Sequence, residues 1–391
     1  MMKTIFIIWV ERLNVLRGGV HRIIHILLEY LPKYGYEVHY LYTTDNYRTF
    51  HHYLAENEDE EIFLSELRQY LLDYHCRLLI GQDAGLSSRL SSMIHKWNIP
   101  NMKYITEYHN SILLIEKVLS KHYWRLTIRY GNSFTSRFLA VLRFMFYPIW
   151  LHFCRKSVAQ NFLASYTVAN RLVILSKFEL PVIKNRVHAD ISKCIVINNP
   201  LSWRKIEDAS ILSKKKKEVL IVSRLYNPEK RIDSALHIWQ ILERRGFVDW
   251  TLRIVGTGVH EEYLKNLTGK LNLRQVRFEG RQDPYPYYLT ASLFMMTSTV
   301  EGWGLTLTES MQTGTVPLAF DSYPALHDII TDGYDGCIVE EGNLEAYADR
   351  MEQLMIHKDE RERIARNGLE SCKRFEINKI INQWVDLIKS L

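Results

Sequence analysis

Short apolar runs alternate with amphipathic stretches along the first hundred residues. Thr4–Val10 is almost wholly apolar and rich in β-branched and aromatic residues, which is typical of a strand covered on both faces. Apolar residues at helical spacing follow, and Pro32 and Gly35 mark the end of that helix. We expect further strands at Glu37–Leu41, Arg77–Ile80 and Lys103–Glu107, and a helix at Ser87–Trp97. Strands separated by helices predict a parallel sheet with crossover helices.

The second half of the chain alternates more regularly. We expect strands at Val219–Val222, Thr251–Val255, Val276–Phe278, Leu293–Met296, Val316–Phe320 and Cys337–Val339. We expect helices at Ile232–Arg244, Glu261–Leu267, Leu305–Thr313, Leu344–Met355, Glu360–Lys373 and Asn378–Ser390. Asn199-Pro200 and the polar stretch that ends in Lys214–Lys217 are typical of a linker. The pattern therefore predicts two doubly wound α/β domains, 1–200 and 201–375, around a cleft, with a C-terminal helix at 376–391.

The composition agrees with an ordinary globular protein. The chain has 391 residues, which is long for one domain. Hydrophobic residues make up 47% of it and charged residues 24%, and this composition excludes the disordered and fibrous classes of protein. Five cysteines lie far apart without a CxxC or Cys/His cluster, so we expect a reducing compartment and neither a disulfide framework nor a structural zinc site. The run Thr4–Val10 is too short to span a membrane, and no small-residue cleavage site follows it. We therefore expect a cytoplasmic protein.

The net charge of +6 is concentrated in the segment 117–178. Ten basic residues and no Asp or Glu lie between Lys117 and Lys177, which leaves 40 basic against 44 acidic residues elsewhere. Within this segment Phe138–Cys154 is rich in aromatic residues and leucine, but Arg143, Pro148 and His152 disfavour a transmembrane helix.

Two interpretations of this basic segment stay open. One is a pair of core helices with basic outer faces. The other is a surface that lies on an anionic bilayer or holds an acceptor. Its cations would be Arg125, Arg129, Arg137 and Arg143, with Trp124, Trp150, Tyr123 and Tyr147 at the interface. Nucleic acid is not expected as a partner, because no recognition motif accompanies the charge.

The stretch Glu301–Glu309 (EGWGLTLTE) carries the most specific chemistry. It follows an expected strand and enters an expected helix, where ligands of open α/β sheets bind. Gly302 and Gly304 let a ligand approach the backbone, and the start of the helix favours an anion. The two carboxylates should lie roughly 10 Å apart, which suits two hydroxyl-bearing groups at either end of a diphosphate. Paired glycosidase carboxylates lie about 5–9.5 Å apart, and spacing alone does not exclude that arrangement.

Two cations lie at the end of another strand in the same predicted domain. Val219–Val222 leads directly into Ser223-Arg224, and Lys230 follows before the next helix. Arginine offers a bidentate fork to a phosphate and lysine a mobile point charge. The same domain therefore supplies both the positive charge and the carboxylates that such a ligand needs.

These motifs resemble those of the retaining glycosyltransferases of family 4. The resemblance rests on Ser223–Lys230 (SRLYNPEK), Val255–Gly258 (VGTG), Phe278–Arg281 (FEGR) and Glu301–Glu309, with a Glu-x7-Glu motif, and it covers essentially the whole second half. Gly18-Gly19 and Asn199-Pro200 look similar too. The family's fold is GT-B, two Rossmann-like domains that face across a cleft, with room for the C-terminal helix to cross back to the first. Arg231 and Ser310 depart from the glycine and alanine usual at these places.

The resemblance implies roles for individual residues. Glu301 and His109 would act at the reacting sugar, and Glu309 would hold the ribose. The donor would be bound by Gly18, Gly19, Arg224, Lys230, Gly256, Arg281, Glu301, Gly302, Trp303, Gly304, Leu305, Thr306 and Glu309. Gly256 and Gly258 could equally form only a tight strand–helix turn. Such enzymes look metal-independent, so no metal site and no cofactor besides the nucleotide-sugar co-substrate are expected.

The expected activity is that of a retaining hexosyltransferase. It would move a sugar from a nucleotide-diphosphate sugar, with UDP favoured, to a glycan or polyprenyl-diphosphate-linked acceptor of a capsule, O-antigen, lipopolysaccharide or similar surface polysaccharide. The protein would work as a peripheral protein on the inner face of the cell membrane. Two alternatives stay open: a non-catalytic membrane-docking subunit of the same fold, and a sugar-nucleotide epimerase or phosphorylase.

Overall fold

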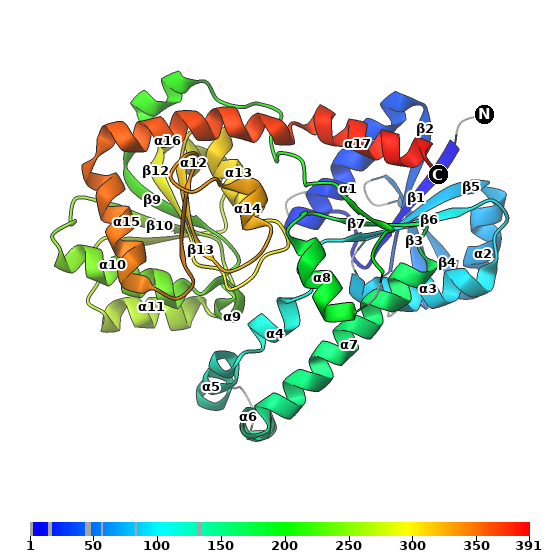
Figure 1. The fold of residues 1–391 in the computed structure, drawn as a ribbon, viewed down its shortest axis with the longest axis horizontal. Coiled ribbons are helices and arrows are strands. Elements are labelled where there is room, and N and C mark those ends of the chain that lie inside the picture. The colour runs from blue at the N-terminus through cyan, green and yellow to red at the C-terminus, as the bar shows by residue number, and fades with distance from the viewer. Residues whose placement is uncertain are drawn as a thin grey trace. The chain divides into compact units, whose positions relative to one another are not determined.

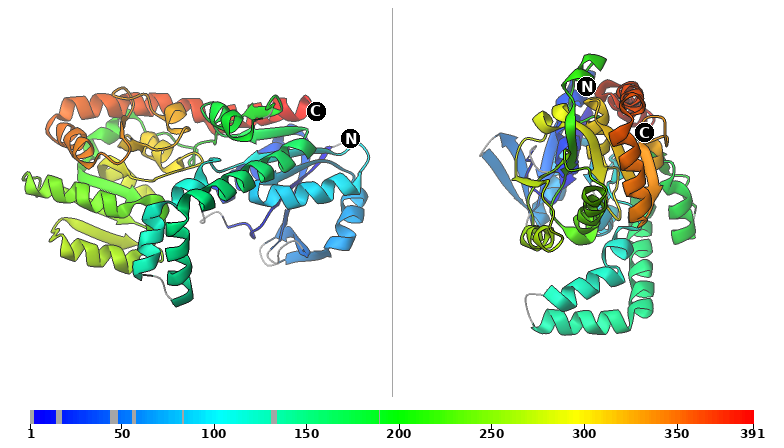
Figure 2. Two further views of the ribbon diagram at one scale, coloured as in Figure 1. Left: turned by 60° about the horizontal axis from the view of Figure 1, so that its bottom comes forward. Right: turned by 90° about the vertical axis from the view of Figure 1, so that its left-hand side faces the viewer.

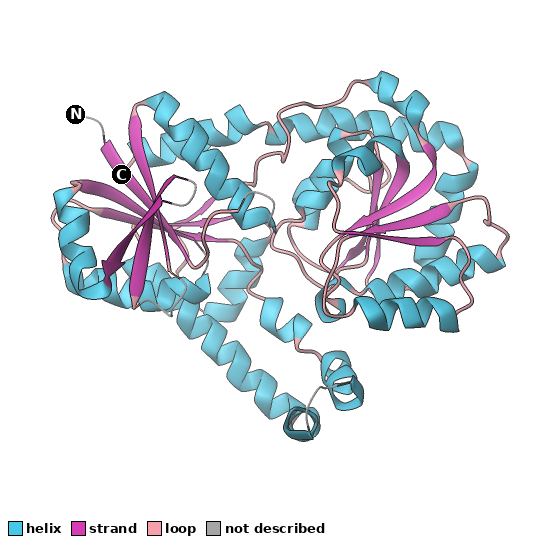
Figure 3. Ribbon diagram, turned by 180° about the vertical axis from the view of Figure 1, so that it is seen from behind, coloured by secondary structure: helices cyan, strands magenta, loops and turns pink. Residues whose placement is uncertain are grey.

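Two β-sheets with helices packed on them organise the chain (Figure 1, Figure 3). The structure is a computed structural model that describes residues 3–14, 18–43, 48–55, 58–82, 84–130, 134–188 and 190–391. The chain forms two compact units. The first comprises Met1–Ile112, Phe153–Pro200 and Phe375–Leu391, and the second comprises Leu113–His152 and Leu201–Arg374.

The sheet of the first unit is parallel apart from one hairpin at its edge. Its strands are β1 (Lys3–Trp9), β2 (Tyr36–Tyr42), β3 (Thr49–Ala55), β4 (Glu58–Phe63), β5 (Cys76–Gln82), β6 (Lys103–Tyr108), β7 (Arg171–Ile174) and β8 (Cys194–Val196). Their spatial order is β4-β3-β2-β1-β5-β6-β7-β8, and β3 pairs antiparallel with β2 and β4. The central strand β1 is apolar on both faces, and Ile5, Phe6 and Ile7 are fully buried. This is the environment that a continuous apolar run predicts.

Helices pack on both faces of this sheet. They are α1 (Gly18–Tyr30), α2 (Leu64–Asp73), α3 (Ala84–Trp97), α8 (Glu179–Val187), α17 (Ile377–Lys389) and the C-terminal part of α7 (Tyr147–Val168). The C-terminal helix α17 lies beside α1, as Figure 1 shows, and buries Ile380 and Trp384 in the core of the first unit. The last helix therefore returns to the N-terminal sheet, as expected.

The second unit has a six-stranded sheet that is parallel throughout. Its strands are β9 (Lys216–Val222), β10 (Thr251–Val255), β11 (Val276–Gly280), β12 (Ala291–Met296), β13 (Val316–Asp321) and β14 (Cys337–Glu340). The spatial order β11-β10-β9-β12-β13-β14 is that of a Rossmann fold, in which the chain reverses direction across the sheet between β9 and β12.

The helices of the second unit form two groups: the first three lie between β6 and β7 in the chain, and the others connect or follow the strands of the second sheet. They are α4 (Leu114–Val118), α5 (Lys121–Tyr130), α6 (Phe134–Met145), α9 (Asn227–Lys230), α10 (Ile232–Arg244), α11 (Glu261–Lys270), α12 (Tyr285–Thr290), α13 (Leu305–Gln312), α14 (Leu326–Ile329), α15 (Leu344–Ile356) and α16 (Lys358–Ser371). Three 3₁₀ turns complete the fold at Leu31–Tyr34, Ala209–Lys214 and Cys372–Phe375. The predicted bounds of α10 and β10 agree with the structure to the residue.

The hairpin β3–β4 and the helix α2 are absent from the sequence prediction. Strand β4 has the sequence EDEEIF, which offers almost no apolar alternation, and it forms through antiparallel pairing with β3. A charged edge strand of this kind also resists pairing with other chains.

The interpretation of Lys214–Lys217 as a solvated linker is wrong. Strand β9 begins at Lys216, and the Lys215 ammonium donates to the carbonyl oxygen of Tyr288 (2.7 Å) and to Thr315 Oγ1 (2.8 Å). Burial lowers the pKa of Lys215 to about 7. A run of lysines resembles a solvated loop in sequence, but here the run starts the central strand of a sheet.

The basic segment 117–178 is divided between the units. Leu113–His152 belongs to the second unit and Phe153–Pro200 to the first, whereas the predicted domain 1–200 would hold the whole segment. Helices α5 and α6 lie side by side in the second unit (Figure 2).

Gly256 and Gly258 form a turn in which backbone touches backbone. Gly256 has φ +136°, and a Cβ there would lie 1.9 Å from the carbonyl oxygen of Ser223. A Cβ on Gly258 would lie 2.6 Å from the carbonyl oxygen of Leu225. The close packing of this turn against the end of β9 is therefore sufficient to explain both glycines.

We expect Gly256→Ala to destabilise the protein strongly, by on the order of 3 kcal/mol, because neither the backbone conformation nor the contact with Ser223 tolerates a methyl group. Gly280→Ala is the matched control, since Gly280 also has a positive φ (+71°) but nothing lies within 4 Å of its Cβ position. It should cost only about 1 kcal/mol. Denaturant unfolding measures both, and equal losses would contradict the steric explanation.

Candidate functional site

The carboxyl ends of β9 and β12 place the candidate residues of the second unit. These strands are neighbours, and the chain leaves them in opposite directions across the sheet, which is where open α/β sheets bind ligands. Ser223-Arg224 follows β9 and leads to the short helix α9, which ends at Lys230. Glu301–Gly304 follows β12 and leads into α13. The fold thus brings both predicted groups to one edge of one sheet.

Lys230 lies buried between two carboxylates. Its Nζ is 2.7 Å from Glu229 Oε1 and 2.7 Å from Glu301 Oε1, and its side chain is 12% exposed. Arg224 reaches the same Glu229, with Nη2 at 3.3 Å from Oε2, but its side chain is 73% exposed. The cluster therefore contains one buried and one accessible cation, and Glu229 is shared by both.

The electrostatics of this cluster favour the charged forms of Lys230 and Glu229. Burial lowers the pKa of Lys230, but the Glu301 and Glu229 carboxylates outweigh it and hold that pKa above its usual value. Burial likewise raises the pKa of Glu229, and the neighbouring Lys230 and Arg224 bring it below its ordinary range. An anion that enters here would meet an ammonium whose present partners are carboxylates of the same site.

The start of α13 is built to receive a ligand at its backbone. Gly304 caps the helix in the left-handed conformation (φ +96°), and no side chain caps the helix by a hydrogen bond. A Cβ at this position would lie 2.6 Å from Tyr323 Oη, so glycine is required here. The first N–H groups, which include those of Leu305 and Thr306, point out of the helix end and favour an anion. Gly302 and Trp303 form the entry, where Trp303 is buried.

Glu309 lies inside α13 and is 1% exposed. Its Oε1 accepts a hydrogen bond from Ser202 Oγ (2.6 Å), and its Oε2 accepts one from Tyr288 Oη (3.1 Å). Both oxygens are thereby oriented by neighbouring hydroxyls. The structure thus fixes Glu309 more tightly than Glu301.

The two departures from the family pattern have structural explanations. Arg231 has φ +48°, which is the left-handed region where glycine costs least. Its guanidinium bonds to Asp233 Oδ1 (3.1 Å) and Ser234 Oγ (2.9 Å), so these contacts offset the strain. The Ser310 hydroxyl donates to the carbonyl oxygen of Leu307 (2.7 Å) within α13. Neither residue changes the charge of the cluster.

Arg281 lies exposed just after β11, next to the turn that holds Gly256 in the neighbouring strand. The backbone N–H of Gly256 donates to the carbonyl oxygen of Gly280 (2.7 Å), which joins the ends of the two strands. The sequence assigned both residues to the border of the donor, and they share the same edge of the sheet with Arg224.

In the first unit, the predicted residues lie at the carboxyl ends of β1 and β6. Gly18 and Gly19 begin α1, and Gly18 has φ +56° with open space around its Cβ position. His109 follows β6 and is buried. Its Nε2 is hydrogen-bonded to Gln82 Oε1, at the end of the adjacent β5, and lies 3.8 Å from Glu107 Oε2.

Burial keeps this cluster uncharged at neutral pH. It lowers the pKa of His109 to about 3 and raises that of Glu107 to about 8, although a hydrogen bond from Gln82 opposes the latter shift. His109 is thus a neutral imidazole. Because Gln82 Oε1 accepts from Nε2, the ring presents Nδ1 as its only acceptor.

The basic helices differ from the expected interface. Trp124 is buried and packs edge-on against Trp150, so its predicted place at a membrane interface is wrong. Arg143 lies over the Trp124 ring and Arg125 over the Phe144 ring, which ties both cations to α5 and α6. Among the remaining predicted cations, Arg137 is exposed, and the side chain of Arg129 lies outside the described residues.

The first cation of the basic segment is neutralised within the second unit. Lys117 Nζ lies 2.9 Å from Glu341 Oε2, so a carboxylate opposes the charge of this lysine. In the part of the chain that the structure describes, no helix is both long and apolar enough to cross a membrane.

Several residues of these sites carry no signal in the sequence. Glu229 joins Arg224 to Lys230, and Ser202 and Tyr288 orient Glu309. Gln82 and Glu107 surround His109 in the same way. Glu229 and Glu107 could have been suspected, because each lies within two residues of a candidate, whereas Ser202, Tyr288 and Gln82 come from elements distant in sequence.

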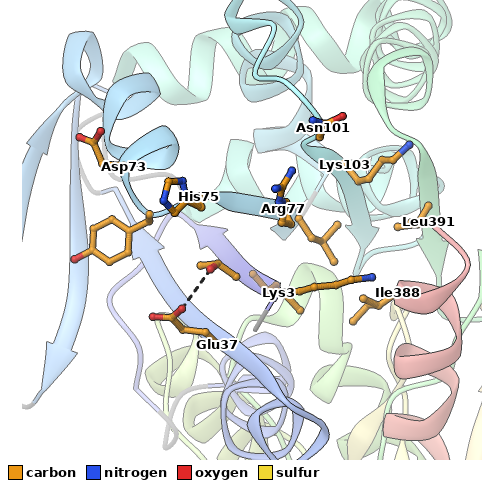
Figure 4. A pocket seen from close by; sticks show the side chains of 13 residues that line it. Lys3, Glu37, Asp73, His75, Arg77, Asn101, Lys103, Ile388 and Leu391 are labelled. Carbon is orange, nitrogen blue, oxygen red and sulfur yellow. Dashed lines mark hydrogen bonds between the residues drawn. The ribbon is translucent and has the colours of Figure 1, made fainter. Parts of the chain in front are cut away.

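A cavity of about 940 Å³ lies at the opposite edge of the first sheet, as Figure 4 shows. Its lining includes the cations Lys3, Arg77 and Lys103 from the amino ends of three strands, and the acidic residues Glu37 and Asp73. Cations and carboxylates line the cavity in comparable numbers, so its lining does not favour a ligand of either charge. It is separate from the carboxyl edge that carries His109.

Comparison with known proteins adds an independent line of evidence. Residues 204–371 match the family described as Glycosyl transferases group 1. An uncharacterized glycosyltransferase of Haemophilus influenzae is 29% identical over 174 residues, which is 44% of this chain and 49% of the relative. A Campylobacter jejuni α-1,4-N-acetyl-D-galactosaminyltransferase, whose substrate is a GalNAc-containing glycan on diphospho-undecaprenol, is 27% identical over 174 residues (44% and 47%). The chain thus spans about half the length of these curated relatives.

Among solved structures, the pneumococcal O-GlcNAc transferase GtfA in complex with UDP and GlcNAc has the same fold. It superposes with a TM-score of 0.70 at 11% identity and covers 100% of this chain and 99% of that one. The protein therefore has the GT-B fold that the sequence predicted, and its residues 204–371 are similar to the glycosyl transferases of group 1.

We expect Glu107 to contribute a stabilisation of the folded protein that is lost as the pH rises from about 5 to 8. Its pKa is about 8 in the folded protein and 4.5 as its ordinary value, so the folded state binds more protons in this range and loses that advantage as the pH rises. Glu107→Gln removes the group that titrates while keeping its shape. The free energy of unfolding of this variant should therefore depend less on pH, by a few kcal/mol over the range. Parallel curves for parent and variant would contradict the assignment.

Proposed function

We propose that the protein is a retaining glycosyltransferase that uses a nucleotide-diphosphate sugar, with UDP as the nucleotide. The observation that carries this proposal is the charged cluster around Lys230. It lies at the ends of β9 and β12, between which the strand order of the second sheet reverses, in the same region as the start of α13, which no side chain caps by a hydrogen bond. Anions bind at such places through helix N–H groups and cations together. The group 1 match over 204–371 covers all of these residues.

The diphosphate would bind against the start of α13 and exchange partners with Lys230. The Lys230 ammonium contacts Glu229 and Glu301. When a phosphate oxygen replaces Glu301 as its partner, the Glu301 carboxylate becomes available to hydroxyls of the transferred sugar. Arg224, which is largely exposed, would close on the phosphates with its planar fork. Binding of the donor would in this way prepare Glu301 for its role.

In the transfer itself, the bond between the anomeric carbon and the phosphate oxygen breaks, and the diphosphate leaves with the electron pair. The acceptor hydroxyl attacks from the same face and gives its proton to the departing phosphate oxygen, so the anomeric configuration is retained without a protein nucleophile. Arg224, Lys230 and the helix end would stabilise the charge that develops on the leaving group. These groups would make the reaction independent of a metal ion.

The acceptor would be a glycan carried on a polyprenyl diphosphate, in the assembly of a surface polysaccharide at the inner face of the cell membrane. The Campylobacter relative acts on a glycan of this kind, which supports the substrate class. His109, a neutral imidazole with Nδ1 as acceptor, would bind a hydroxyl of the reacting sugar.

A direct assay tests the proposal. The protein is incubated with UDP-sugars, with and without an undecaprenyl-diphosphate-linked oligosaccharide. Release of UDP should require the acceptor, and NMR of the product should show the same anomeric configuration as the donor. UDP-sugar isomerisation without acceptor would indicate an epimerase, a requirement for inorganic phosphate would indicate a phosphorylase, and an inverted product would exclude the retaining mechanism.

We expect Arg224→Ala to weaken UDP binding by roughly tenfold to a hundredfold, because a charge-assisted hydrogen bond to phosphate is worth about 1.5–3 kcal/mol. The side chain is exposed, so the substitution should leave the fold intact. Titration calorimetry with UDP provides the measurement, and Arg277→Ala, an exposed arginine of β11, provides the control. If both variants bind UDP like the parent, the phosphate site is elsewhere.

We expect Glu301→Gln to lower kcat by roughly a hundredfold or more while UDP affinity changes less than about threefold. The amide keeps the size of the side chain but loses the charge that would orient the sugar hydroxyls. Glu262→Gln, an exposed carboxylate of α11, should leave both quantities unchanged. A Glu301→Gln enzyme with parental kcat would remove Glu301 from the mechanism.

A further inference from the structure

Helix α6 and the first turns of α7 expose large apolar side chains to an unusual degree. Within the part of these helices that belongs to the second unit, the six most exposed are 47–84% accessible: Phe134, Phe138, Leu139, Met145, Phe146 and Ile149. Single exposed apolar residues are normal on a protein surface, but a contiguous group of large ones marks an interaction site. We call these six side chains the apolar patch.

The geometry of α6 separates the apolar patch from the helix's inner side. At about 100° per residue, the apolar residues of α6 cover an arc of roughly 160°. Ala140, which is fully buried, lies on the opposite side of the helix, where α5 packs. Arg137 and Arg143 fall at the two margins of the arc. The helix is therefore amphipathic in the sense of an interfacial helix, with cations along both borders of the apolar face.

The breadth of this arc distinguishes among occupants. A protein groove that receives a helix contacts a narrow stripe at i, i+3, i+4 and i+7. The exposed apolar side chains of α6 spread over nearly half its circumference, and Phe146 and Ile149 extend this surface towards α7. So broad a surface is better matched by a fluid medium than by a groove of fixed shape. The hydrocarbon boundary of a bilayer is such a medium.

The charge around the apolar patch favours an anionic surface. No Asp or Glu occurs between Lys117 and Lys177, so the cations that border the patch have no acidic neighbours in this segment. A second copy of the chain would bring the same basic segment against itself, which like-charge repulsion opposes. Anionic lipid headgroups supply the opposite charge, and long arginine side chains can reach them while their stems stay apolar.

We propose that the apolar patch inserts into the headgroup–acyl boundary of an anionic lipid bilayer and docks the protein there. The aromatic and aliphatic side chains of α6 and α7 supply the contact, rather than the interfacial tryptophans expected from the sequence, because Trp124 is buried under Arg143. The apolar patch would be the surface that holds the protein at the membrane location proposed above. Docking does not require sugar transfer, since vesicle binding needs neither donor nor acceptor.

Co-sedimentation of the full chain with vesicles tests the inference. The parent protein should bind vesicles of phosphatidylcholine with 30% phosphatidylglycerol at least tenfold more tightly than pure phosphatidylcholine. Phe138→Ser with Phe146→Ser should reduce that binding at least tenfold. The matched control is Val248→Ser with Ile356→Ser, two residues of the second unit with 55% and 57% exposure against 54% for each phenylalanine. Its binding should equal that of the parent.

A second measurement uses variants that keep the patch apolar. Lipids brominated on their acyl chains should quench the added tryptophan of Phe146→Trp and leave that of Ile356→Trp unaffected. Equal sedimentation of the Phe138/Phe146 variant and the parent would overturn the inference, and so would equal quenching of the two tryptophan variants. A parent that binds neither vesicle but changes from dimer to monomer on substitution of the two phenylalanines would assign the patch to a second copy instead. A protein that docks without transferring sugar would refute only the proposed function.

Discussion

A buried ammonium group shared by two carboxylates fixes the chemistry of the second unit. Lys230 is removed from water, so its charge persists only because Glu229 and Glu301 compensate it. The same contact joins the segment after β9 to the loop after β12 and engages one carboxylate oxygen of Glu301. The ion pair therefore ties together the two segments that carry the candidate residues. Under the proposed function, a ligand that competes for the lysine would release Glu301.

The parallel architecture could be predicted from the sequence because it depends on patterns that a single chain displays. Buried strands such as β1 and β12 are visible in the sequence as continuous apolar runs. Amphipathic helices such as α10 are visible because their apolar residues recur at helical spacing. Strand β4 could not be found this way, since its acidic residues form a strand only in pairing with β3. Lys215 was misread for a related reason: burial of a lysine depends on carbonyl groups contributed by distant elements.

The candidate site shows the same division. Arg224, Lys230, Glu301 and Glu309 were found because their spacing and their glycine neighbours form a recognisable pattern. The residues that orient them were not found, because Ser202 and Tyr288 meet Glu309 only in the folded unit. Backbone conformation was equally hidden. The sequence left two interpretations of Gly256 open, a ligand contact and a tight turn, and its contact with Ser223 alone is sufficient to require glycine.

The neutrality of the His109 cluster has a consequence for where electrostatic attraction can arise. With His109 unprotonated and Glu107 protonated at neutral pH, the two groups contribute no net field at their edge of the first sheet. If the ligand is a nucleotide-diphosphate sugar, as proposed, its long-range attraction must come from other charges, such as the cations Arg224 and Lys230 after β9. Dissolved salt screens fields between charges but leaves short hydrogen bonds to a neutral imidazole almost untouched. Ionic strength would consequently affect capture of the ligand's phosphates while sparing the contacts that read its hydroxyls.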